Sequence, residues 1–132
     1  MRELIDALFK ESLIQRCLLK DAEIIKQTST YIQLLNRAED TNLRIQFLAN
    51  YDALLRLIEI LLLDFGYMLG DNPHSTTRRI IEYLAPQFEI SRIISLRHLV
   101  KKSDYQPPLD ELHYLISIRL TIQELSFPLT QN

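Results

Sequence analysis

The chain contains little of what turns, disulfides and membrane spans are made from. Only 2 of its 132 residues are Gly and 5 are Pro, too few for a β-sandwich or barrel, which needs a turn about every ten residues. The single cysteine, Cys17, allows no internal disulfide or cysteine-based metal cluster, which indicates a reducing compartment. The longest aliphatic run, Ile60–Leu63, is far too short to cross a membrane. No signal peptide is evident at Met1-Arg2-Glu3-Leu4, so a cytoplasmic protein is expected.

What is present is the balance of a folded globular protein. Hydrophobic residues make up 47% of the chain and charged residues 24%, and a chain of this length supports one hydrophobic core. We therefore expect a single helical domain over residues 1–132.

The net charge of -2 is unevenly distributed along the chain. Residues 1–77 and 103–132 each carry a net charge of -3, whereas residues 78–102 carry +4. This basic segment could hold a phosphate-bearing ligand or an acidic partner. The simpler interpretation is a solvated helix face.

Two helices are predicted in the first 38 residues, although the sequence leaves open whether they are one bent helix. Apolar residues four apart predict a helix over about 2–19, with Cys17 as a small core residue on its apolar stripe. A second helix, over about 22–38, has Ile25, Ile32, Leu35 and Ala38 on a similar stripe.

The segment 42–69 is expected to form the central and most buried helix, because residues 53–63 are apolar on most sides. Asp52, Arg56 and Glu59 follow one narrow stripe and are interpreted as an intrahelical ion-pair ladder. Gly66 or Gly70 would end this helix, with Gly70 preferred as the residue after the C-cap.

Three further helices are predicted in the second half. They cover about 76–84, with Ser75 as N-cap, then 88–102 and 109–126. The expected fold is an all-α bundle of five or six helices.

Common catalytic and cofactor motifs are absent, and the sequence predicts no cofactor. The three histidines, His74, His98 and His113, are too scattered to suggest a metal site. His74 precedes the 76–84 helix, where it could support the turn. Alternatively, with Arg78 and Arg79 one turn later, it could contact an anion at the helix N-terminus.

Several short motifs follow one another in residues 50–106: Asn50-Tyr51-Asp52-Ala53, the leucine-rich stretch that runs into Asp64-Phe65-Gly66-Tyr67, Asn72-Pro73-His74-Ser75, Leu96-Arg97, and Lys101-Lys102-Ser103-Asp104-Tyr105. In this order they resemble the HEPN superfamily of small helical domains, and the resemblance implies a HEPN-like part over about 22–126.

The resemblance implies a homodimeric bundle, often encoded beside a minimal nucleotidyltransferase antitoxin in a toxin–antitoxin or defence module. Active members of the superfamily are metal-independent ribonucleases with an Arg-x(4–6)-His motif. Its imidazole acts as acid or base, and its guanidinium neutralises charge on the phosphate. Arg92 and His98 fit this motif and are the candidate catalytic pair. On a continuous helix, however, six residues place them on different faces.

Binding without strong nuclease activity is therefore the expected function, and its ligand could be RNA, a nucleotide or a partner protein. The candidate RNA- or anion-binding residues are His74, Arg78, Arg79, Arg97, Lys101, Lys102 and Tyr105, whose ring could stack on a base. Two alternatives are an active HEPN ribonuclease toxin, with Arg92/His98 or Arg97/Lys102, and a helical interaction protein with no nucleic-acid role.

Overall fold

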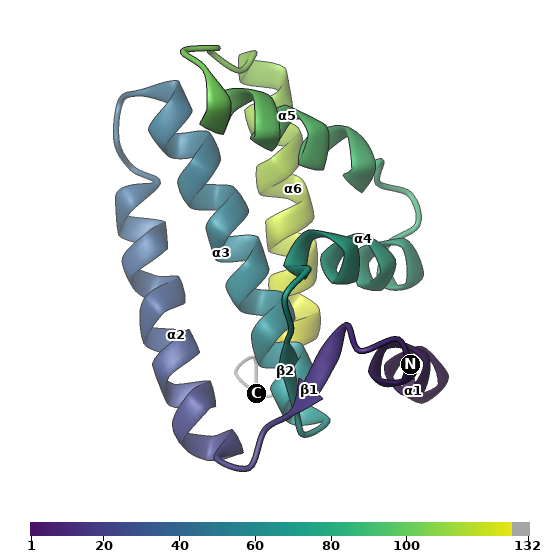
Figure 1. Ribbon diagram of the computed structural model, residues 1–132. Coiled ribbons are helices and arrows are strands. Elements are labelled where there is room, and N and C mark those ends of the chain that lie inside the picture. The colour runs from purple at the N-terminus through teal and green to yellow at the C-terminus, as the bar shows by residue number, and fades with distance from the viewer. Residues whose placement is uncertain (128–132) are drawn as a thin grey trace.

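The computed structural model describes residues 1–127, which form six helices and one small two-stranded sheet (Figure 1). The all-α bundle predicted from the sequence is confirmed. In chain order the elements are α1 (Arg2–Lys10), β1 (Ile14–Arg16), α2 (Lys20–Arg37), α3 (Leu43–Asp64), β2 (Tyr67–Leu69), α4 (Pro73–Leu84), α5 (Ile90–Lys102) and α6 (Leu109–Ser126).

Helix α3 is the central element, as expected. It lies between α2 and α6, while α4 and α5 lie across one side of it (Figure 1). Asn42 caps its N-terminus by accepting hydrogen bonds from the backbone N–H of Arg44 and Ile45, at 2.9 and 3.1 Å. Leu57 and Ile58 are fully buried. Burial of apolar side chains on nearly every face of α3 forms the core of the bundle.

The predicted helix over 2–19 is wrong beyond Lys10. The chain turns at Ser12, whose φ is +60°, and then forms β1, which pairs antiparallel with β2. Cys17 lies just after β1, half-buried, and its N–H donates to the carbonyl of Gly66 at 2.9 Å. The apolar spacing continues past residue 10, but pairing with a distant strand decides the backbone conformation.

The predicted end of the central helix is also corrected. Helix α3 ends at Asp64, and Gly66 rather than Gly70 follows the C-cap with a φ of +89°. Gly70 is required for a different reason, because a Cβ there would lie 2.8 Å from the carbonyl oxygen of Leu13. Likewise Asn72, not Ser75, caps α4, since its side chain accepts from the Ser75 N–H.

Helix α2 matches the predicted 22–38 segment, but its predicted apolar stripe is only partly directed at the core, because Leu35 packs against the core whereas Ile25 and Ile32 are exposed. Ile25 and Ile32 are 72% and 54% exposed, whereas Gln27 and Tyr31 are buried. Tyr31 hydrogen-bonds Gln123 and Arg119 of α6, so the face that α2 turns inward makes polar contacts as well as the apolar contacts of Leu34 and Leu35.

Within residues 1–127, no helix is long and apolar enough to cross a membrane.

Candidate functional site

Three helices bring a tyrosine, two histidines and an arginine together. Tyr51 comes from α3, His74 from the first turn of α4, and Arg97 and His98 from α5. The Tyr51 hydroxyl lies 2.8 Å from His74 Nδ1, and the Arg97 guanidinium is 3.5 Å from His74 Nε2. The ring centroids of His74 and His98 are 5.5 Å apart, edge to face. We call these four residues the tyrosine–histidine–arginine cluster.

The hydrogen bonds of the cluster define one tautomer of His74. A guanidinium only donates, so Nε2 must be unprotonated to accept from Arg97. Nδ1 then carries the proton and donates to the Tyr51 hydroxyl oxygen. Burial lowers the pKa of His74, and the nearby charges of Arg97 and His98 lower it further, so the neutral imidazole is favoured.

Tyr51 forms the floor of the cluster. Its side chain is fully buried, and burial raises the pKa of its hydroxyl well above the ordinary value, so it remains protonated. The Arg97 guanidinium carbon lies 5.3 Å from the Tyr51 ring centroid in a cation–π contact. Arg97 Nε is shielded from solvent and has no hydrogen-bond partner in the described chain. Tyr51 and His74 thus hold Arg97 in place without neutralising its charge.

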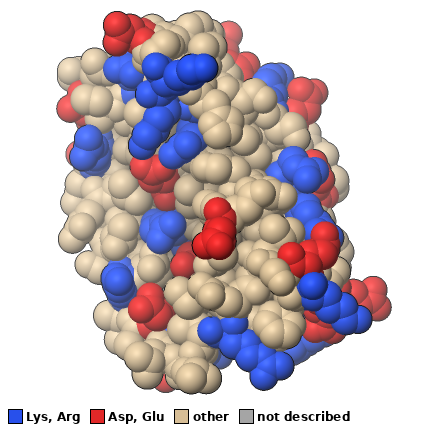
Figure 2. All heavy atoms as spheres, in the orientation of Figure 1, with Lys and Arg blue, Asp and Glu red and all other residues tan. Residues whose placement is uncertain are grey.

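Basic side chains continue from the cluster to the C-terminal end of α5. His98, Lys101 and Lys102 are exposed, and the described chain offers Arg97, Lys101 and Lys102 no ion pair. Figure 2 shows Lys and Arg side chains gathered at the upper left, over this end of α5 and the start of α3. We call Arg97, His98, Lys101 and Lys102 the α5 basic surface.

The surroundings of this surface add an aromatic ring and a recess. Tyr105, in the loop after α5, is 37% exposed, as a base-stacking residue needs to be. Beside Lys101 lies a recess of about 220 Å³, whose charged lining residues are Arg37, Asp52 and Lys101. Asp52 therefore supplies a carboxylate within the basic region.

Arg92, one of the candidate catalytic pair, takes part in a different set of contacts. Its guanidinium lies 3.3 Å from Glu89 and 3.2 Å from Glu111, and 4.5 Å from the Tyr114 ring centroid. No contact joins it to His98 in the part of the chain that the structure describes. Helix α5 is unbroken over Ile90–Lys102, so the two side chains leave it on different faces, as their spacing predicts.

Arg78 and Arg79 are engaged by carboxylates. Arg78 pairs with Glu82 at 3.4 Å, and Arg79 pairs with Glu11 of the segment after α1 at 2.6 Å. His74 contacts Tyr51, Arg97 and His98 instead. The predicted anion site at the start of α4 is therefore divided. Arg78 and Arg79 form ion pairs with carboxylates, whereas His74 contacts residues of α5.

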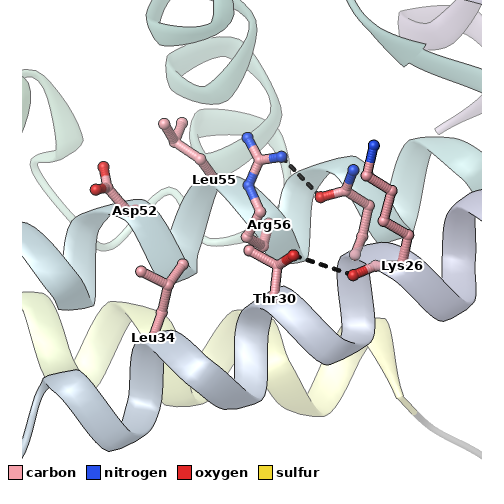
Figure 3. Close-up of a pocket in the computed structure, with 7 residues that line it drawn as sticks. Lys26, Thr30, Leu34, Asp52, Leu55 and Arg56 are labelled. Atoms are coloured by element: carbon pink, nitrogen blue, oxygen red, sulfur yellow. Dashed lines mark hydrogen bonds between the residues drawn. The ribbon is translucent and has the colours of Figure 1, made fainter.

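The polar stripe of α3 is not the predicted intrahelical ion-pair ladder. Arg56 donates to Gln27 of α2 at 2.7 Å, and buried Glu59 accepts from the backbone N–H of Leu69 at 2.6 Å. Asp52 and Arg56 line a second recess between α2 and α3, of about 420 Å³ (Figure 3). Lys26 of α2 lines it as well. The polar stripe therefore connects α3 to other elements. Arg56 and Glu59 hydrogen-bond residues outside the helix, and Asp52 lines the recess between α2 and α3.

Two residues of the site do not belong to the set predicted from the sequence. Tyr51 enters the sequence argument only through the Tyr-Asp-Ala motif, which is the one signal that could identify it. Arg44 is a second addition, because its guanidinium donates to the carbonyls of Val100 and Ser103, both at 2.7 Å, at the end of α5. Its sequence context carries no such signal, since the contact spans more than fifty residues.

Comparison with known proteins yields no match to a family model, a curated protein or a solved structure. The HEPN resemblance therefore remains a prediction that rests on the motifs in the sequence.

Proposed function

We propose that this chain is a HEPN-like, RNA-binding helical domain, and that the α5 basic surface holds the RNA backbone without rapid cleavage. On this proposal Arg97 contacts a phosphate, Lys101 and Lys102 extend the contact along the strand, and Tyr105 stacks on a base. A cytoplasmic location and a place in a toxin–antitoxin or defence module belong to the same proposal.

The observation that carries the proposal is the contrast between paired and unpaired cations in the basic segment. Arg78, Arg79 and Arg92 each face a carboxylate within 3.4 Å. Arg97 instead contacts an aromatic ring and a neutral imidazole, which orient the guanidinium but leave its charge uncompensated. A fixed, uncompensated guanidinium beside exposed lysines suits a phosphate diester.

The same geometry supports weak rather than rapid nuclease activity. Cleavage of RNA next to a 2′-hydroxyl needs one group to accept a proton and another to donate one. Both ring nitrogens of His74 are engaged, which leaves His98 as the exposed imidazole of the cluster. Arg92 is held by Glu89 and Glu111 and does not join it.

A ribonuclease built on the cluster is the second candidate, and the contact between His74 and His98 is the observation that favours it. If RNA binding displaced Arg97 from His74 Nε2, two imidazoles and a guanidinium would face one phosphate. RNA cleavage that disappears in both His74→Ala and His98→Ala would support this candidate over binding alone.

Salt-dependent binding of a fluorescent single-stranded RNA tests the proposal. The Arg97→Ala/Lys101→Ala variant should weaken binding at least tenfold and reduce the salt slope by about 1.4, or about 0.7 for each phosphate that is no longer neutralised. The matched control is Arg78→Ala/Arg79→Ala, which removes two arginines of the same segment and should change affinity less than about twofold. Equal effects in both variants, or no RNA binding by the wild type, would refute the proposal.

A further inference from the structure

The recess beside Lys101 places one carboxylate next to the cations of the α5 basic surface. Its volume is about 220 Å³, and its apolar lining consists of Leu34, Ile45, Leu48 and Ala49. Pockets for drug-sized ligands have volumes of roughly 300–1,000 Å³, so this recess suits a single smaller group with an apolar face, such as a nucleobase. Because its acidic residue is Asp52, we call it the Asp52 recess.

The Asp52 side chain is half-buried, and its carboxylate is able to accept hydrogen bonds from a ligand. Within residues 1–127 it forms no hydrogen bond or ion pair, although Arg37 and Lys101 line the same recess. Burial lowers the pKa of His74 most, and the negative charge of Asp52 opposes that decrease. Asp52 therefore lies close enough to the tyrosine–histidine–arginine cluster to act on it.

Cations lie on both sides of Asp52. Along α3, the Asp52 recess is lined by residues within 45–52 and the larger recess between α2 and α3 by residues within 52–56, so the two extend in opposite directions from Asp52. Lys101 lines the first, whereas Lys26 and Arg56 line the second (Figure 3). An RNA strand held by these cations would pass over Asp52, whose negative charge repels phosphate. The carboxylate is therefore placed to face a base rather than the backbone.

We infer that the Asp52 recess binds a guanine base of the RNA strand, an inference that rests on the proposed RNA-binding function. The Watson–Crick edge of guanine carries two adjacent donors, the N1–H and the N2 amino group, and a carboxylate accepts from both. Adenine, cytosine and uracil each present a single donor group beside an acceptor at this edge, and that acceptor would be repelled by a carboxylate. The apolar lining then packs against the faces of the base, while Lys101 contacts the adjoining phosphate.

Fluorescence anisotropy with four short oligouridine probes tests the inference. The probes carry guanosine, adenosine, cytidine or uridine at one central position, so all of them offer the same phosphates. The wild type should bind the guanosine probe about fivefold or more tightly than each of the other three, which is the lower end of the discrimination expected from a bidentate contact to a base.

Three variants make the test specific. Asp52→Asn should reduce the guanosine preference below about twofold, because the amide keeps one acceptor and replaces the other with a donor. The matched control is Asp104→Asn, which removes the same charge from an exposed position just after α5, outside the recess, and should keep the preference. Arg97→Ala should weaken binding of all four probes by a similar factor, because a phosphate contact carries no sequence information. Circular dichroism should show that the variants are as helical as the wild type.

The outcomes separate this inference from the proposed function. Equal binding of the four probes by the wild type, or a guanosine preference that Asp52→Asn retains, would overturn the inference and leave RNA binding at α5 intact. No binding of any probe would refute the proposed function, and mononucleotides would then decide the role of the recess. Binding of guanosine monophosphate in preference to adenosine monophosphate, lost in Asp52→Asn, would support a guanine site for a free nucleotide, whereas equal or absent binding would overturn it.

Discussion

Helices α3 and α5 both contribute to the candidate site, yet they relate to the rest of the molecule in opposite ways. Helix α3 is buried on nearly every side and supplies Tyr51 from within the core. Helix α5 buries a narrow stripe, Ile90, Ile93 and Val100. It turns Arg92, His98, Lys101 and Lys102 to solvent and leaves Arg97 half-buried. The comparison suggests that α3 determines stability and α5 determines binding. Substitutions in the two helices should therefore affect different measurements.

The largest effect is expected for Leu57→Ala in α3. Leu57 is fully buried, so the substitution removes apolar packing and leaves a cavity, at a cost of about 2–5 kcal/mol. Urea denaturation measures the free energy of unfolding directly. A cost below about 1 kcal/mol would show that α3 is not the central core element.

A smaller effect is expected for Glu59→Ala, also in α3. Glu59 is 5% exposed and accepts the Leu69 N–H, so its removal leaves that buried donor unpaired, at a cost of about 1–3 kcal/mol. Glu59→Gln is the control, because its side-chain oxygen can still accept.

The pH dependence of these variants provides a further check. Burial raises the pKa of Glu59, so the wild type loses stability as the pH rises from the ordinary carboxyl value through the raised one. Glu59→Gln cannot ionise. Its stability relative to the wild type should therefore increase between about pH 4 and 7, and a constant difference would contradict the burial of a charged carboxylate.

Arg92→Ala tests whether Arg92 contributes to stability rather than to RNA binding, in contrast to Arg97 and Lys101 on the same helix. Arg92 links Glu89, Glu111 and Tyr114 but is 44% exposed, so thermal melting should show a decrease in stability of about 1 kcal/mol or less. RNA affinity should change less than about twofold, because this charge is already compensated. The reverse pattern, with unchanged stability and no RNA binding, would place the binding surface around Arg92 instead.

The smallest effect is expected from titration of His74. Its folded-state pKa is below the ordinary 6.5, so the unfolded chain binds the proton more readily and stability decreases as the pH falls below 6.5. His74→Asn should lose less stability than the wild type between about pH 7 and 5. An identical pH profile for both chains would show that burial and the Arg97 and His98 charges do not act on this imidazole.

Much of the fold can be predicted because helix signals are local. The 109–126 helix matches α6, and the Asn42 region begins α3 as its capping chemistry requires. The strand at Ile14–Arg16 cannot be predicted in this way, since its partner lies more than fifty residues away at Tyr67–Leu69. The apolar stripe of Ile25 and Ile32 is misleading because periodicity identifies an apolar face but not what covers it.

The candidate site is only partly predictable for the same reason. Counting charges locates the basic segment 78–102, but two of the carboxylates that pair with its arginines, Glu11 with Arg79 and Glu111 with Arg92, lie outside this segment. The contact of His74 with Arg97 likewise joins two helices. Residue types thus indicate a basic region, and the tertiary contacts of the described chain then distinguish its paired cations from its unpaired ones.

Nuclear magnetic resonance of the three histidine rings tests the central claim most directly. His74 and His98 lie in the tyrosine–histidine–arginine cluster, whereas exposed His113 lies on α6 and serves as an internal reference. Titration with a short single-stranded RNA should shift the ring signals of His74 and His98 and leave those of His113 unchanged. Shifts of all three rings, or of His113 alone, would contradict an RNA site at α5.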